Sequence, residues 1–150
     1  MHRSMVTYVT IHHLRCFASL FIILFFFTII SHPVANAEQN RFVAPIGQDG
    51  IQRVEILAGE YYFTPNYIIL KVNVPTELKI KKESSVIPHD IVVKAPEAGM
   101  DIAEDISSEP RTIKFTPTQT GKFPFYCSKK FLFFKTHRER GMEGIIEVVQ

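Results

Sequence analysis

Acidic residues are absent from the first 37 positions of the 150-residue sequence, where Arg3 and Arg15 are the only Lys or Arg side chains. The uncharged apolar run over residues 17–30 has 14 residues. It is shorter than the roughly 20 residues that a membrane-spanning helix needs. Residues 35–37 then read Ala-Asn-Ala, the small-residue pattern that precedes a cleavage site. We therefore predict a secretory signal peptide over residues 1–37 and a periplasmic or secreted protein; an uncleaved membrane anchor is the alternative.

Residues 38–150 lack any excess of positive charge. The whole chain has 17 Lys and Arg against 15 Asp and Glu, and the two excess arginines lie in the predicted signal peptide. The remaining chain is formally neutral, which argues against a nucleic-acid-binding surface. It also contains no second cysteine to pair with Cys127, so an internal disulfide is excluded.

Sustained helical periodicity is also absent after the signal peptide, and short runs that alternate apolar and polar residues take its place. Such runs, separated by turn residues, predict a β-sandwich or barrel. Residues 94–110 are expected to be irregular, and residues 38–50 to form a polar, flexible lead. The expected strands are at residues 52–57, 61–63, 67–74, 76–82, 87–93, 111–115, 122–127 and 144–149.

The architecture predicted for residues 51–150 is all-β, a single Greek-key antiparallel β-sandwich of about eight strands. A chain of this length can bury one core without disulfides. Pro124 has no amide hydrogen to donate, so its strand is expected to be at a sheet edge or bulged there. The side chains expected to face the core are Val54, Ile56, Ile69, Leu70, Leu78, Ile80, Ile91, Val93, Ile113, Phe115, Ile145 and Val148.

The candidate metal ligands of residues 38–150 are few. Cys127 is the only cysteine, His89 and His137 are the only histidines, and Met142 follows closely after the second histidine. A thiolate, two imidazoles and a weak thioether suit a copper ion that cycles between Cu(I) and Cu(II). Strand alternation places both His89 and Cys127 on the same strand faces as apolar residues, which restricts access of water. We expect one copper ion to bind these four residues.

Each of these residues also has an ordinary structural explanation. A buried free cysteine packs as a small hydrophobic residue, and lone histidines and methionines are common in cores. A structural zinc site would need four strong ligands, and only three are present. A nucleophilic Cys–His pair is a further alternative, but no residue is identifiable that would orient the base or bind a substrate. The order His, Cys, His, Met, with the last three within 16 residues, favours the metal site over these explanations.

Four segments carry a resemblance to a known family: YYFTPNYIILKVNVPTELKI from Tyr61, PHDIVV from Pro88, GKFPFYC from Gly121 and GMEGIIEV from Gly141. They resemble the cupredoxins, the plastocyanin- and azurin-type blue-copper domains that are related to the copper domain of cytochrome oxidase subunit II. The sequence is most similar to short periplasmic cupredoxin-like proteins, a group that includes the domain of the EfeO-type iron-uptake proteins.

The resemblance implies a type 1-like copper site with His89, Cys127 and His137 as equatorial ligands and Met142 as the axial ligand. One feature departs from the family pattern. Nine residues separate Cys127 from His137, whereas the usual electron carriers of the family have two to four there. The resemblance thus predicts the ligand set, and the spacing leaves the geometry of the site open.

The function we predict is one-electron transfer between periplasmic redox partners, without enzymatic activity. A copper carrier or buffer with the same ligands is one alternative, and a metal-free interaction domain is another. An apolar run from Phe131 to Phe134 is flanked by the basic residues Lys129, Lys130, Lys135 and Arg138. This patch is a candidate docking surface for an acidic redox partner. The alternative is that the aromatic side chains cover the end of the core and the charges are solvated.

Overall fold

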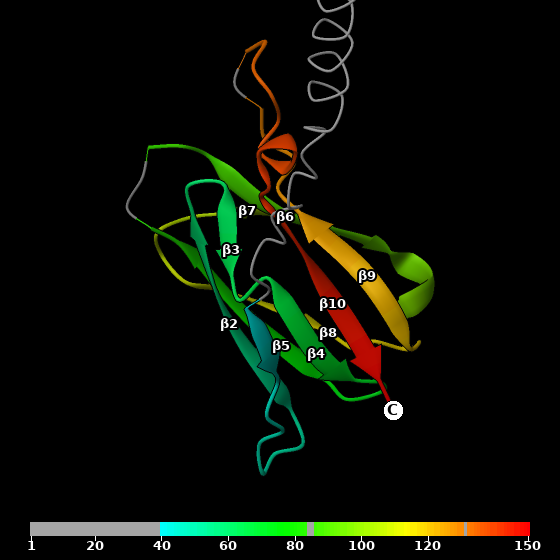
Figure 1. The fold of residues 1–150 in the computed structure, drawn as a ribbon. Helices are drawn as coiled ribbons and strands as arrows, with labels where there is room; N and C mark the ends of the chain where they lie inside the picture. The colour runs from blue at the N-terminus through cyan, green and yellow to red at the C-terminus, as the bar shows by residue number, and fades with distance from the viewer. Residues whose placement is uncertain (1–39, 84–85, 131) are drawn as a thin grey trace, which may run out of the picture. The chain divides into compact units, whose positions relative to one another are not determined.

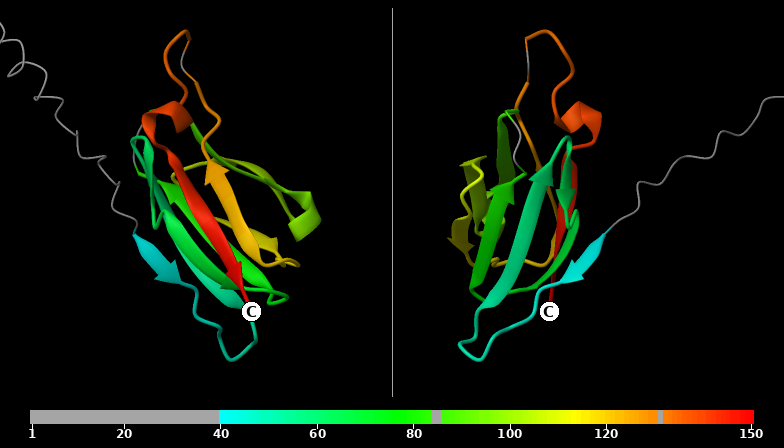
Figure 2. Two further views of the ribbon diagram at one scale, coloured as in Figure 1. Left: turned by 45° about the vertical axis from the view of Figure 1, so that its right-hand side comes forward. Right: turned by 90° about the vertical axis from the view of Figure 1, so that its left-hand side faces the viewer.

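The computed structural model describes residues 40–83, 86–130 and 132–150. Two β-sheets pack face to face in this part of the chain (Figures 1 and 2). The predicted signal peptide lies outside the described residues. Within the described ranges, no helix has the length and apolar character needed to cross a membrane.

The larger sheet has six strands in the order β1-β4-β10-β9-β6-β7, and the smaller has four in the order β3-β2-β5-β8. Two short 3₁₀ helices, η1 and η2, lie between strands. The bounds are β1 Arg41–Val43, β2 Gln52–Gly59, β3 Tyr62–Thr64, β4 Tyr67–Lys71, β5 Thr76–Lys82, β6 His89–Ala95, η1 Pro96–Ala98, β7 Met100–Ile106, β8 Arg111–Phe115, β9 Gly121–Tyr126, η2 Arg138–Arg140 and β10 Glu143–Val149.

The all-β sandwich confirms the predicted fold class, but the sheets are mixed rather than wholly antiparallel. Strand β4 pairs in parallel with both β1 and β10, and β2 pairs in parallel with β5. The pair β2 and β5 is parallel because the chain crosses to the larger sheet as β4 before it returns. Alternation of side chains shows which face is buried but not the direction of a strand.

Two of the ten strands were not predicted. Strand β1 lies in the segment expected to be a flexible lead, and it pairs with β4. Strand β7 lies in the segment expected to be irregular, and its whole length pairs with β6. Both segments are polar, and three of the seven residues of β7 are acidic. Acidic residues are depleted in strands, so composition hid a strand whose Met100, Ile102 and Ile106 are buried.

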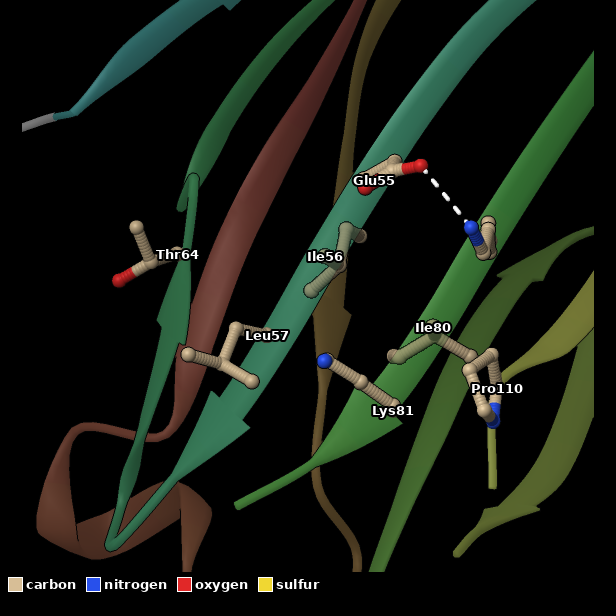
Figure 3. A pocket seen from close by; sticks show the side chains of 8 residues that line it. Glu55, Ile56, Leu57, Thr64, Ile80, Lys81 and Pro110 are labelled. Carbon is tan, nitrogen blue, oxygen red and sulfur yellow. Dashed lines mark hydrogen bonds and ion pairs between the residues drawn. The ribbon is translucent and has the colours of Figure 1, made fainter. Parts of the chain in front are cut away.

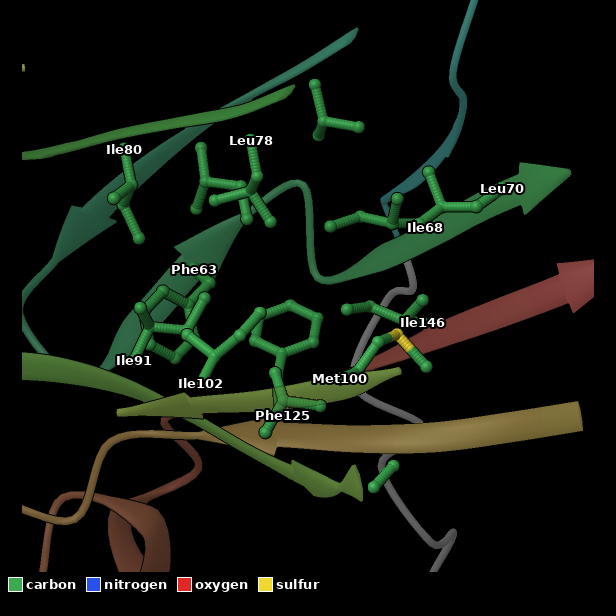
Figure 4. Close-up of a cluster of buried hydrophobic side chains, with 14 of the residues drawn as sticks. Phe63, Ile68, Leu70, Leu78, Ile80, Ile91, Met100, Ile102, Phe125 and Ile146 are labelled. Atoms are coloured by element: carbon green, nitrogen blue, oxygen red, sulfur yellow. The ribbon is translucent and has the colours of Figure 1, made fainter. Parts of the chain in front are cut away.

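The core fills the space between the two sheets (Figure 4). Most of the predicted core residues are buried there: Val54, Ile56, Leu70, Leu78, Ile80, Ile91, Val93 and Val148. Two predictions were wrong by one position, because Ile68 and Ile146 are fully buried while Ile69 and Ile145 are only partly buried. Residues two apart on a strand share a face, so Ile68 accompanies Leu70. Ile113 and Phe115 pack at the margin of the core.

Pro124 occupies a position where β9 is locally an edge. It lies opposite Ile145 of β10, whereas the pairing of β9 with β6 begins only at the next residue, Phe125. On one side of β9 no ladder therefore exists at Pro124, and the missing amide hydrogen removes no bond there. This arrangement meets the requirement that the sequence imposed.

A hollow of about 200 Å³ lies on the strands β2 and β5, and Figure 3 shows it from close by. Glu55 and Lys79 form an ion pair across it with a distance of 3.1 Å between Oε1 and Nζ. None of the residues that line it is a histidine or a cysteine. The candidate metal ligands named above therefore lie elsewhere in the fold.

Candidate metal centre

The topology brings three strand ends together. Strand β6 begins at His89, β9 ends at the residue before Cys127, and β10 begins at the residue after Met142. Because β9 is antiparallel to both β6 and β10, the end of β9 adjoins the starts of its two neighbours. Residues far apart in sequence thus meet at one end of the larger sheet.

Three side-chain donor atoms converge at this end. The Cys127 Sγ atom lies 3.4 Å from the His137 Nδ1 atom and 3.9 Å from the His89 Nδ1 atom, and the two Nδ1 atoms are 3.2 Å apart. A point equidistant from three atoms with these separations lies about 2.0 Å from each, within the range of metal–imidazole bonds and close to that of metal–thiolate bonds. The triangle has the dimensions of a metal site.

All three donors are shielded from solvent. The exposed fractions are 1% for His89, 0% for Cys127 and 3% for His137. Three lone pairs that face one another need protons or a cation between them. The other ring nitrogen of His89, Nε2, is buried without a hydrogen-bond partner in the described part of the chain. The donor set, a soft thiolate with two imidazoles, fits a copper ion.

Burial also sets the protonation of the site. It lowers the pKa of His89 to about 4, with a further contribution from the positive charge of His137. Burial and the nearby Arg140 lower the pKa of His137 as well. Burial raises the pKa of the Cys127 thiol to about 11, although the backbone N–H groups of Asp90 and Lys129 partly offset this effect. At neutral pH the imidazoles are ready to bind a metal, and binding displaces a proton from the thiol.

Met142 is fully buried beside the other predicted ligands. Its backbone N–H donates to the His137 carbonyl over 3.0 Å, and its carbonyl accepts from the Cys127 N–H over 3.0 Å. These two bonds fix the main chain of Met142 between two members of the cluster. Its role as the axial ligand stays a prediction.

The long spacing between Cys127 and His137 does not separate them. The His137 N–H donates to the Lys129 carbonyl over 2.9 Å, which closes the base of the insert. The described residues between them extend past the strand ends, and Figure 2 shows this excursion in orange. Lys129 is only two positions after Cys127, so this hydrogen bond brings His137 back beside the cysteine. The insert therefore adds a loop without displacing the ligand.

Asp90 belongs to the site although it was not predicted as a functional residue. It follows His89 and is 7% exposed. Its carboxylate accepts hydrogen bonds from the Ser128 N–H over 2.6 Å and from the Ser128 hydroxyl over 2.5 Å. Since Ser128 follows Cys127, this carboxylate joins the strand of one ligand to the strand of the other. No sequence signal marked it, because the contact spans 38 residues.

Tyr61 is the second residue of the site that was not predicted. Its ring meets the His137 ring edge to face, with centroids 4.9 Å apart and an interplanar angle of 86°. The Arg140 guanidinium lies over the same tyrosine ring, 4.6 Å from its centroid. Tyr61 is in the turn between β2 and β3, so the smaller sheet supplies one wall of the cluster.

The two packed sheets and the cluster of His89, Cys127 and His137 at one end fit a cupredoxin-like β-sandwich, and the sequence comparison agrees. The profile of the cupredoxin-like domain matches residues 19–138, a range that includes His89, Cys127 and His137. The chain therefore belongs to the cupredoxin-like domain family. A comparison with curated protein sequences gave no significant match.

Solved structures share the fold. The metal-binding domain of the Cu(I)-exporting P-type ATPase CopA of Streptococcus pneumoniae, determined with Cu(I), is 24% identical with a TM-score of 0.57, and the match covers 75% of this chain and 98% of that one. Reduced auracyanin of Roseiflexus castenholzii is 20% identical with a TM-score of 0.52, and the match covers 65% of this chain and 97% of that one. The periplasmic domain of cytochrome oxidase subunit II of Bradyrhizobium japonicum is 17% identical with a TM-score of 0.50, and the match covers 65% of this chain and 83% of that one.

Proposed function

We propose that the protein is an exported copper protein that holds one ion through His89, Cys127 and His137, with Met142 as a weak axial ligand, and transfers single electrons. The observation that carries this proposal is the buried triangle of donor atoms, with sides of 3.2, 3.4 and 3.9 Å. A bound copper ion supplies a one-electron Cu(II)/Cu(I) couple.

The positions of the three equatorial donors in the fold support electron transfer. The three equatorial donors are held by a strand start, a strand end and a loop whose base is hydrogen-bonded. Such a frame keeps the ligand positions nearly constant, so a change of oxidation state moves few atoms. The imidazole of His137 also borders a surface pocket. Of the three equatorial ligands, His137 is the one that lines this pocket and it has the largest exposed fraction, 3%, so an electron would enter or leave through its imidazole.

Copper carriage is the second candidate, and the likeness to the CopA domain determined with Cu(I) favours it. The burial of the donors opposes it. A carrier passes its ion to another protein through ligands that the partner can reach, whereas His89, Cys127 and His137 are at most 3% exposed. An electron needs no such access. Electron transfer is therefore the function that the geometry supports best.

We also propose that an acidic redox partner docks on the insert. Leu132, Phe133 and Phe134 are 68%, 83% and 47% exposed, and Phe131 lies outside the described residues. Of the predicted basic rim, Lys129 already pairs with Asp105 and Arg138 with Glu143. Lys130 and Lys135 form no ion pair among the described residues. These two cations beside exposed apolar side chains suit an acidic partner.

Two measurements on the copper-loaded protein test the proposed function. Stepwise reduction and reoxidation should be reversible, with one electron for each copper ion. In a competition with a Cu(I) chelator, the protein should release its ion slowly, because the donors are buried. Rapid release together with irreversible reduction would support carriage instead. Failure to bind copper in either oxidation state would leave the metal-free interaction domain.

A further inference from the structure

A pocket of about 360 Å³ opens in front of His137. Its walls are aromatic or aliphatic, and two cations, Lys130 and Arg140, stand beside them. The volume is at the lower end of the range of about 300–1,000 Å³ that is usual for small-molecule sites. The apolar lining residues are Tyr61, Val86, Ile87, Pro88 and Phe134.

The backbone of Tyr61 indicates that this wall is not incidental. Its φ is +63°, in the left-handed region that bulky residues rarely adopt. That conformation is unfavourable for a residue with a Cβ atom, and glycine or asparagine would fill the turn more easily. The strained turn holds the tyrosine ring edge-on to His137 and beneath Arg140. The turn alone does not require a tyrosine at this position, so the contacts of the ring with His137 and Arg140 account for it.

Arg140 differs from every other arginine that the structure describes. Arg41, Arg53, Arg111 and Arg138 each form an ion pair with a carboxylate. Arg140 forms none in the described ranges, and its guanidinium is instead stacked on Tyr61. Stacking on one face leaves the N–H groups at the edge of the guanidinium available, in the fork that matches a carboxylate. Lys130 has no ion pair in these ranges either.

We propose that this pocket binds a small aromatic carboxylate. The ring of the ligand lies against Tyr61, Ile87 and Phe134, and its carboxylate pairs with Arg140 and Lys130. The apolar walls account for the ring, and the two cations account for the charge: neither forms an ion pair in the described ranges, although Lys130 and Glu139 interact electrostatically at longer range. Such a ligand covers the solvent side of His137. The proposal does not depend on copper, because none of these contacts involves the metal.

NMR titration of the metal-free, ¹⁵N-labelled protein with benzoate tests the proposal. Benzamide matches the ring without the charge, and acetate matches the charge without the ring. Benzoate should bind at least tenfold more tightly than either compound, with shifts centred on Tyr61 and His137. Arg140→Gln should weaken benzoate binding about tenfold, because a hydrogen-bonded ion pair is lost.

Arg138→Gln is the matched control, since that guanidinium is stacked on Tyr126, 4.3 Å from the ring centroid, and pairs with Glu143. It should leave benzoate binding unchanged. Equal affinities for benzoate, benzamide and acetate, or equal effects of the two arginine variants, would overturn the proposal. If benzoate shifted no signals at the pocket but an acidic polypeptide did, the cavity would be part of a protein-docking surface, and the proposal would also be wrong.

Discussion

The carboxylate of Asp90 is predicted to stabilise the end of the sheet that carries the candidate ligands His89 and Cys127. Asp90→Ala removes two short hydrogen bonds to Ser128, and hydrogen bonds to a charged group contribute about 1.5–3 kcal/mol each. Ser128 itself is exposed, so water replaces part of what is lost. We expect the free energy of unfolding to fall by about 2–3 kcal/mol, and the midpoint temperature by about 10 °C for a domain of this size.

Urea denaturation of the metal-free protein measures this loss. Asp105→Ala is the matched control, because Asp105 pairs with the same Lys129 as Asp90 does but its side chain is 79% exposed. Exposed ion pairs contribute about 0–1 kcal/mol, so this control should be almost neutral. Asp90→Asn keeps one acceptor oxygen and should be intermediate. If Asp90→Ala were no more destabilising than Asp105→Ala, the carboxylate would not join the two ligand strands.

Three further predictions follow from the site. The free energy of unfolding of the metal-free protein should fall as the pH is lowered from 6.5 to about 4. Burial lowers the pKa of His89 in the folded state, so the unfolded state takes up the proton first. Urea titrations at several pH values measure this slope, and His89→Gln should flatten it. Replacement of residues 130–136 by two glycines should leave the copper-binding stoichiometry unchanged, because the His137 N–H already bonds to the Lys129 carbonyl. The shorter loop should raise the free energy of unfolding by less than about 1 kcal/mol. Tyr61→Gly should relieve the backbone strain yet broaden the NMR signals of His137, whereas Tyr61→Phe should change neither.

Much of the fold could be predicted from the sequence, because alternation marks strands that have one buried face. It failed where composition opposed it. The acidic strand β7 alternates correctly, with Met100 and Ile102 buried, but its carboxylates resemble those of a loop. They are tolerated because they point outward and meet cations, such as the pair of Asp101 with Lys94. The parallel pairings were beyond reach, since strand direction depends on how the chain crosses between sheets.

The candidate site was predictable to the extent that its residues are chemically distinctive. Only one cysteine and two histidines follow residue 37, and the fold brings all three together. The surrounding residues have no such signature. Asp90 meets Ser128 across 38 positions, and Tyr61 reaches His137 from the other sheet. Contacts of this kind depend on the packing of the two sheets, which no local pattern contains.

The insert shows why spacing alone did not decide the geometry. Nine residues between two ligands can hold them apart or can loop out; here the hydrogen bonds from the His137 N–H to the Lys129 carbonyl and from the Met142 N–H to the His137 carbonyl hold His137 beside Cys127. Closing a longer loop adds little entropic penalty, because the penalty grows only with the logarithm of loop length. The cluster of His89, Cys127 and His137 can therefore keep its dimensions while the loop carries exposed side chains such as Leu132 and Phe133.

The visible absorption spectrum of the protein with one equivalent of Cu(II) tests the central claim most directly. A thiolate bound to Cu(II) gives an intense charge-transfer band, so the proposed site predicts a strong band that saturates at one equivalent and is absent from Cys127→Ser. The serine variant should remain folded, because the two side chains are similar in size. A spectrum without this band in the wild-type protein, or the same band in Cys127→Ser, would contradict the assignment of Cys127, His89 and His137 as the copper site.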